Sequence, residues 1–195
     1  MIRIISGLYK GKKLKRVRSP LVRPLPGKVK ETLFNIIQEK VKGSHFLDGF
    51  AGTGSVGIEA LSRLAEFVVF IEEYYPAVKV IKSNLQKCNP EDNFLIIHKE
   101  FNRAVIKLSK ENKTFDIIFL DPPYRLLDKR NPLKVIKKRH ILKTNGLIIL
   151  RHHFKTQFDA KYFRLLRKTR CGDDTLAFYK QEPAQSQEKV GKHEN

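Results

Sequence analysis

The sequence predicts an α/β protein built on a doubly wound, mostly parallel sheet. Short apolar runs alternate with longer amphipathic segments, and a glycine-rich turn joins the first main strand to a helix. The run IIFL, residues 117–120, suits a strand buried on both faces, and it stops at two prolines, which cannot continue a hydrogen-bonded ladder. Two late apolar runs predict a closing hairpin that adds an antiparallel strand.

The expected elements follow one another along the chain. Amphipathic spacing predicts helices at residues 28–41, 55–65, 76–87, around 105–108 and 132–142. Apolar runs predict strands at residues 45–48, 67–72, 93–101, 115–120, 147–150, 162–166 and 175–179. Asn145-Gly146 predicts a turn before the strand at 147–150. We divide the chain into an N-terminal arm with a hairpin (1–27), a main domain (28–180) and a polar tail (181–195) that is expected to be disordered.

The charge of the chain points to a polyanionic partner. Its 39 Lys and Arg residues exceed 20 Asp and Glu residues, which leaves a net charge of +19. No acidic residue precedes Glu31, which predicts that the arm is a hairpin that binds RNA. The alternatives are a disordered basic tail and a basic surface that is only solvated. The arm cations that we expect to contact RNA are Arg3, Lys10, Lys12, Lys13, Arg23 and Lys28.

Cysteine usage and hydropathy favour a cytoplasmic location. Cys88 and Cys171 form no CxxC pair, which fits a reducing compartment without a structural disulfide or zinc site. No apolar run approaches the ~20 residues of a membrane span, and the first residues lack the apolar core of a signal peptide. We expect no metal, no membrane association and no obligate protein partner, and therefore a monomer.

The glycine turn, Gly52 to Gly57, lies between a predicted strand and a predicted helix. Glycines allow the tight turn and let a ligand approach bare backbone amides. Glu72 ends the second strand at the distance, about 20 residues, that is typical of a ribose-binding acid; a solvated strand end is the alternative. A phosphate-loop triphosphatase is disfavoured because no lysine follows Gly54, whereas the turn alone also fits a nicotinamide-dependent oxidoreductase.

Asp121, Pro122, Pro123 and Tyr124 emerge at the carboxyl end of the central strand, where open α/β sheets bind ligands. A carboxylate and a proline-fixed carbonyl make a paired acceptor for an amino group, and a tyrosine offers a face for a flat ring. The alternative is a Pro-rich turn in which Asp121 accepts hydrogen bonds from loop amides.

Together, the glycine turn, an acid after each of the next two strands and the DPPY motif resemble the class I S-adenosylmethionine-dependent methyltransferases, a Rossmann-like fold. The resemblance implies S-adenosylmethionine as cofactor, with its ribose held by Glu72 and its adenine facing Glu100 and Phe101. The residues implied around its methionine part are Asp48, Gly52 and Gly54, and Phe50, Ala51 and Thr53 are expected to bind the cofactor as well. The [DN]PP[YF] motif belongs to members that methylate exocyclic or amide nitrogens.

A more specific similarity covers residues 1 to about 180. The runs RIISGLYKGKKL, VKETLFNII, LDGFAGTGSVGIEALSR, FDIIFLDPPY and GDDTLAFY are similar, in this order, to the RsmD family of 16S rRNA guanine-N2 methyltransferases. The family implies one guanine of 16S rRNA in the small ribosomal subunit as substrate. The chain differs from the usual pattern at Leu25, Gly27-Lys28, Leu64, Glu100 and Arg151, which predicts a changed substrate side near residues 24–28 and 151.

Three other functions use parts of the same pattern. An amino-methyltransferase acting on adenine N6 or cytosine N4 shares the chemistry, but no sizeable target-recognition domain is evident. A protein-glutamine methyltransferase has no use for a charge of +19. A non-catalytic rRNA-binding assembly factor would not need the intact glycine turn, Glu72 and DPPY.

Overall fold

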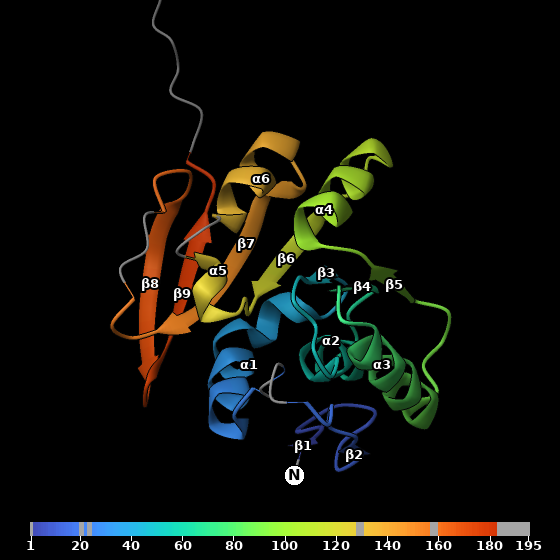
Figure 1. Cartoon of the computed structure of the whole chain (residues 1–195). Coiled ribbons are helices and arrows are strands. Elements are labelled where there is room, and N and C mark those ends of the chain that lie inside the picture. Colours follow the sequence, from blue (N-terminus) through green and yellow to red (C-terminus); the bar gives the residue numbers. More distant parts are fainter. Residues whose placement is uncertain (1, 20–21, 23–24, 128–130, 157–159, 183–195) are drawn as a thin grey trace, which may run out of the picture.

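The computed structural model describes residues 2–19, 22, 25–127, 131–156 and 160–182. A seven-stranded sheet lies between two layers of helices, with a two-stranded hairpin at the N-terminus (Figure 1). The strands are β1 (Ile2–Arg3), β2 (Lys13–Leu14), β3 (His45–Asp48), β4 (Phe67–Glu72), β5 (Phe94–His98), β6 (Phe115–Leu120), β7 (Leu142–His153), β8 (Arg164–Cys171) and β9 (Asp174–Lys180). The helices are α1 (Gly27–Val41), α2 (Ser55–Ser62), α3 (Tyr75–Cys88), α4 (Phe101–Lys110), α5 (Tyr124–Leu127) and α6 (Pro132–Arg139).

The strand order of the main sheet is β5-β4-β3-β6-β7-β9-β8. The first five strands are parallel, β9 runs antiparallel to β7, and β8 runs antiparallel to β9. The chain therefore winds outward from β3 to β5 and then returns to β6 on the other side of β3. This reversal of strand order opens a crevice at the carboxyl ends of β3 and β6, which is where such sheets bind ligands.

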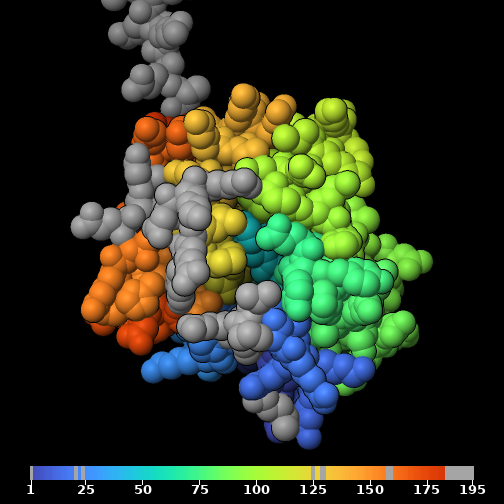
Figure 2. Space-filling view, viewed as in Figure 1, coloured from blue at the N-terminus to red at the C-terminus, as the bar shows by residue number. Residues whose placement is uncertain are grey.

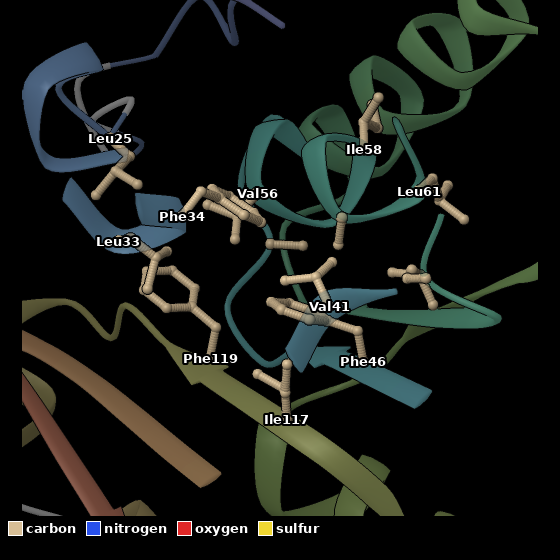
Figure 3. Packing of buried hydrophobic residues seen from close by; sticks show 14 of the residues in the cluster. Leu25, Leu33, Phe34, Val41, Phe46, Val56, Ile58, Leu61, Ile117 and Phe119 are labelled. Atoms are coloured by element: carbon tan, nitrogen blue, oxygen red, sulfur yellow. The ribbon is translucent and has the colours of Figure 1, made fainter. Parts of the chain in front are cut away.

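Each face of the sheet buries its own apolar cluster. On one face, α1, α2 and α3 pack over Phe46, Ile117 and Phe119 (Figure 3). On the other face, α4, α5 and α6 cover Ile118 and Leu120. Because successive side chains of β6 point to opposite, equally buried faces, the strand needs an unbroken apolar run. The doubly wound sheet predicted from that run is confirmed.

The hairpin of the N-terminal arm packs on α2. Its hairpin pairs Ile2 with Leu14, and both side chains belong to the same apolar cluster as α1 and α2. Gly7 has a φ of +82°, and a Cβ atom there would lie only 1.7 Å from the carbonyl oxygen of Ser62. Glycine at this position thus lets the hairpin backbone approach the last turn of α2.

A buried ion cluster joins the arm to α2. Glu59 is fully buried and accepts hydrogen bonds from the backbone N–H groups of Ile5 (2.8 Å) and Ser6 (3.0 Å). The same carboxylate pairs with Lys30 of α1 at 3.2 Å and with Arg63 at 3.0 Å. Two cations and two amides therefore compensate one buried charge, as burial of an ion requires.

Several element boundaries differ from the prediction. The Asn145-Gly146 turn was wrong, because β7 starts at Leu142 and a register shift against β6, between Phe115 and Ile117, absorbs the extra residues inside the strand. The strand predicted at 162–166 runs instead over Arg164–Cys171, as its pairing with β9 extends to the turn at Gly172. Helix α5 was not predicted. Most of the polar tail lies outside the described residues.

In the described part of the chain, no helix combines the length and the apolar character that crossing a membrane would require.

Candidate active site

The glycine turn joins β3 to α2 at the crevice. Gly52 and Gly54 adopt φ values of +54° and +74°, a region that favours glycine over residues with a Cβ atom. The N–H of Ala51 donates to the carbonyl of Ile71 (2.9 Å), which ties the turn to the end of β4. Figure 2 shows the teal residues of this region recessed between the yellow segment that follows β6 and the mint-green segment that follows β4.

Glu72 braces the glycine turn from the end of β4. One carboxylate oxygen accepts from the N–H of Gly52 (2.7 Å) and the other from the N–H of Tyr74 (2.8 Å). Burial raises the pKa of Glu72, and these amide hydrogen bonds oppose that rise. Each oxygen retains acceptor capacity after one hydrogen bond, so the ribose-binding role of Glu72 stays a prediction that its position favours.

Asp48 ends β3 and is almost fully buried. Its carboxylate accepts from the N–H of Gly57 in α2 (3.0 Å). Burial raises the pKa of Asp48 to about 7, the Gly57 hydrogen bond opposes this, and the charges of Asp121 and Glu72 add to the rise. Three carboxylates from β3, β4 and β6 thus converge on the crevice and favour a ligand that brings positive charge or hydroxyl donors.

An aromatic pair lies beside the glycine turn. The rings of Phe50 and Phe101 stack with centroids 4.7 Å apart and an angle of 21° between their planes. Glu100 precedes α4 and accepts from the N–H of Arg103 (3.1 Å), which makes it the N-cap of that helix. Stacked rings suit a flat heterocycle, and the roles of Glu100 and Phe101 toward an adenine stay predictions.

Asp121, directly after β6, is held by an arginine that the sequence analysis did not place in the site. Nη1 of Arg151 lies 2.8 and 2.9 Å from the two carboxylate oxygens of Asp121. Nη2 of Arg151 lies 2.9 Å from Oδ1 of Asp174, at the start of β9. The Arg151 and Asp174 side chains are each 10% exposed and that of Asp121 is 17% exposed.

This ion triad sets the charge of the site. Burial raises the pKa of Asp121 to about 6, and attraction to Arg151 opposes the rise.

The rest of the DPPY motif follows Asp121. Pro122 is buried, Pro123 is exposed, and the carbonyl of Pro123 accepts from the N–H of Leu126 as α5 begins. The side chain of Tyr124 lies outside what the structure describes, so its stacking role remains a prediction.

Most of the predicted RNA-binding cations of the arm are exposed on the surface. Arg3, Lys10, Lys13 and Lys28 are exposed, whereas Arg23 lies outside the described residues. Lys12 is also exposed, but its Nζ donates to the carbonyls of two residues at the end of α3, Lys87 at 2.8 Å and Cys88 at 3.3 Å. Lys12 therefore attaches the arm to the end of α3 and also contributes to its positive charge.

Asn84 connects the arm to the glycine turn and was missed in the sequence. It is fully buried in α3, and its amide exchanges hydrogen bonds with the backbone of Lys15 (2.7 and 3.1 Å). Nδ2 of Asn84 also donates to the carbonyl of Thr53 at 3.0 Å. A polar residue on the apolar face of a predicted helix was the available signal.

No group of three His, Cys, Asp or Glu side chains among the described residues is arranged to hold a metal ion.

The geometry can be compared with known proteins. The profile of a family described as "Conserved hypothetical protein 95" matches residues 2–180. The chain belongs to this family, the RsmD family. Among relatives, "Putative rRNA methyltransferase YlbH" of Bacillus subtilis (strain 168) is 35% identical over 92% of this chain and 98% of its own length. "Ribosomal RNA small subunit methyltransferase D" of Haemophilus influenzae is 39% identical over 75% of this chain and 76% of its own length.

A solved structure shares the fold. "Putative methyltransferase yhhF from Escherichia coli" superposes with a TM-score of 0.78 at 28% identity and covers 93% of this chain and 98% of that chain. The predicted Rossmann-like methyltransferase fold is confirmed.

Two departures from the usual RsmD pattern have structural consequences. Leu64, where a glycine is usual, keeps a φ of +66° and is 46% exposed, so it accepts a backbone strain that glycine would avoid. Arg151, where an acid is usual, supplies the cation that contacts Asp121.

Proposed function

We propose that this RsmD-family protein transfers a methyl group from S-adenosylmethionine to the exocyclic N2 amine of one guanine in 16S rRNA, within the small ribosomal subunit. The observation that carries the proposal is the position of Asp121. This carboxylate follows the central strand β6, precedes two prolines and lies close enough to Asp48, beside the glycine turn, to raise its pKa. The family and the names of its relatives support the choice of rRNA.

The crevice fits the proposed cofactor. Bare amides at the glycine turn, the carboxylates of Asp48 and Glu72, and the stacked Phe50 and Phe101 would hold its methionine, ribose and adenine parts. When bound, the cofactor supplies a methyl group on a positively charged sulfur. Three carboxylates around the site favour that positive charge.

Asp121 and the carbonyl of Pro122 would accept the two hydrogens of the guanine amine. A carboxylate has about four acceptor positions, and Nη1 of Arg151 contacts each oxygen of Asp121 once, which leaves capacity for the amine. The amine nitrogen is thereby aimed at the methyl group, and the carboxylate stabilises the positive charge that develops on it. As the nitrogen–carbon bond forms, the sulfur–carbon bond would break, and the nitrogen would release one proton to Asp121 or to water. Tyr124 would stack on the splayed base.

Arg151 acts in this scheme as a positioning residue. Its Nη1 contacts both oxygens of the Asp121 carboxylate, which holds this group in place, and its charge favours the ionised form that accepts hydrogen bonds. Asp174 in turn holds the guanidinium in place. The departure at residue 151 therefore supports the proposed chemistry.

The proposal is tested by methyl transfer from radiolabelled S-adenosylmethionine to purified small and large ribosomal subunits that lack the modification. We expect label in the small subunit alone. Asp121→Asn should lower the rate by roughly 100-fold or more, on the scale of removing one preorganised catalytic group. Asp116→Asn is the matched control, since Asp116 lies on the same strand at its other end and pairs with Lys143. Full turnover by Asp121→Asn would refute the role of this carboxylate.

A further inference from the structure

A second strongly basic surface lies far from the arm in sequence. Strand β8 is the edge of the main sheet and pairs only with β9 among the described strands. Between Ala160 and Gly172 the chain contains no acidic residue. The exposed cations of the strand, which we call the β8 surface, are Arg164, Arg167, Lys168 and Arg170.

No carboxylate neutralises the β8 surface in the described part of the chain. Nε of Arg167 donates to the hydroxyl of Thr169 (2.9 Å), and Nε of Arg170 donates to the carbonyl of Gly172 (3.0 Å). The Arg170 guanidinium also lies 4.0 Å from the centre of the Phe154 ring. These contacts orient the side chains without neutralising their charge. Repulsion between unneutralised like charges destabilises the folded protein, and a bound anion would relieve it.

The β8 surface leads to the active site. Strand β8 runs in the same direction as β6 and β7, so its carboxyl end reaches the edge of the sheet that carries Asp121. There Cys171 pairs with Asp174, which contacts Arg151, which contacts Asp121. Figure 1 shows β8 on the left and the arm hairpin at the bottom, so the two basic elements lie on different sides of the molecule.

We propose that the β8 surface is a second docking site for the RNA backbone, distinct from the arm. The inference rests on the proposed function in that the RNA held there is the methylation substrate. Three of the four cations are arginines, whose planar forks match phosphate oxygens. The register with β9 places Arg164 and Arg167 on one face of this edge strand and Lys168 and Arg170 on the other. The cations therefore line both sides of the sheet edge, where a phosphate chain that runs along the edge can contact them.

RNA is favoured over an acidic protein by the uninterrupted charge of β8. Leu165 and Leu166 are each 44% exposed between the cations. Two leucines offer little apolar area compared with the ~800 Å² that each partner buries in an ordinary protein interface. Phosphate contacts and counterion release need no such area, because they depend on charge.

The test replaces Arg164, Arg167, Lys168 and Arg170 with glutamine. The control replaces Lys40, Lys42, Lys110 and Lys113 with glutamine. These lysines are exposed at or just after the carboxyl ends of α1 and α4, before the amino ends of β3 and β6 and so at the end of the sheet opposite to Asp121. Both variants lose four positive charges. Circular dichroism and thermal melting check that both fold, and fluorescence anisotropy measures binding to a labelled RNA hairpin with a guanine in its loop, over a series of KCl concentrations.

We expect the β8 variant to reduce the slope of log affinity against log salt by about 3, since each lost phosphate contact removes roughly 0.7–0.9. The control should change the slope by less than about 1. Equal slopes for both variants would overturn the proposal, as would loss of binding to small subunits with unchanged binding to the hairpin, which would assign β8 to a ribosomal protein.

The two proposals fail differently. A β8-dependent salt slope without any methyl transfer by the wild-type protein would retain the docking site and reject the proposed function. Methyl transfer with an unchanged slope and unchanged KM for RNA in the β8 variant would retain the function and reject the docking site.

Discussion

Replacing Arg151 with methionine tests the ion triad, because methionine keeps much of the stem volume and removes the charge. The guanidinium lies within 2.9 Å of both Asp121 and Asp174, and all three side chains are largely buried. Removing one partner of a buried ion pair costs about 3–5 kcal/mol because it leaves an uncompensated charge. We expect a loss of this size in the free energy of unfolding at neutral pH, measured by urea denaturation.

The same change should move the pH dependence of methyl transfer. The pKa of Asp121 is about 6, already above its ordinary value because of burial, and Arg151 opposes a further rise. If the ionised carboxylate accepts the amine hydrogens, the rate increases with pH through about 6 in the wild type. Without the cation the midpoint should move upward by at least about one pH unit, which corresponds to about 1.4 kcal/mol.

The assay is kcat measured from pH 5 to pH 9 with saturating RNA. Arg151→Met combined with Asp174→Asn is the companion variant, since it leaves only one of the two carboxylates charged. It should recover part of the lost stability and keep the shifted pH profile. An unchanged midpoint and kcat in both variants would refute the positioning role, whatever happens to stability.

Three further predictions concern the arm and the cofactor site. Gly7→Ala should destabilise the protein by roughly 1–3 kcal/mol more than Gly11→Ala, the usual cost of overpacking, as measured by thermal or urea unfolding. Both residues have a φ of +82°, so the backbone strain is common to both variants, and only the Gly7 Cβ meets α2. Glu59→Gln should cost about 3–5 kcal/mol in urea denaturation, because it leaves buried Lys30 without its anion, and adding Lys30→Met should recover part of that loss. Asp48→Asn should raise the melting temperature of the ligand-free protein at pH 8 but much less at pH 4, while weakening S-adenosylmethionine binding in calorimetry.

The sign for Asp48 follows from its raised pKa. The folded state holds the proton up to about pH 7, whereas the unfolded chain releases it near pH 4. Folding stability from this group is therefore present at low pH and lost as pH rises toward 7. A variant that cannot ionise avoids the loss. A larger gain at pH 4 than at pH 8 would contradict the burial of this charge.

The central features of the fold were predictable because residues close together in the sequence specify them. The apolar run before Asp121 and the glycines after Asp48 each specify a strand and a turn within a few residues. Parallel strands then bring their carboxyl ends together, so the convergence of Asp48, Glu72 and Asp121 follows from fold class alone.

The ion clusters were not predictable because they depend on long-range register. Arg151 reaches Asp174 only because β7 and β9 pair antiparallel, with His153 opposite Asp174. Glu59 meets Lys30 through the packing of α1 and the arm on α2. The sequence shows that the cation Arg151 follows the run LIIL, but nothing in it named the partners of this side chain. Asn145-Gly146 misled for the same reason, since tertiary pairing overrode a local turn signal.

The most direct test is nucleoside analysis of 16S rRNA after methyl transfer from labelled S-adenosylmethionine to small subunits that lack the modification. Label in N2-methylguanosine, and its loss with Asp121→Asn, is the predicted result. Label in a methylated adenosine or cytidine would contradict the assignment of the guanine amine. Tight binding to the small subunit without any label would contradict the enzyme itself and leave an rRNA-binding assembly factor.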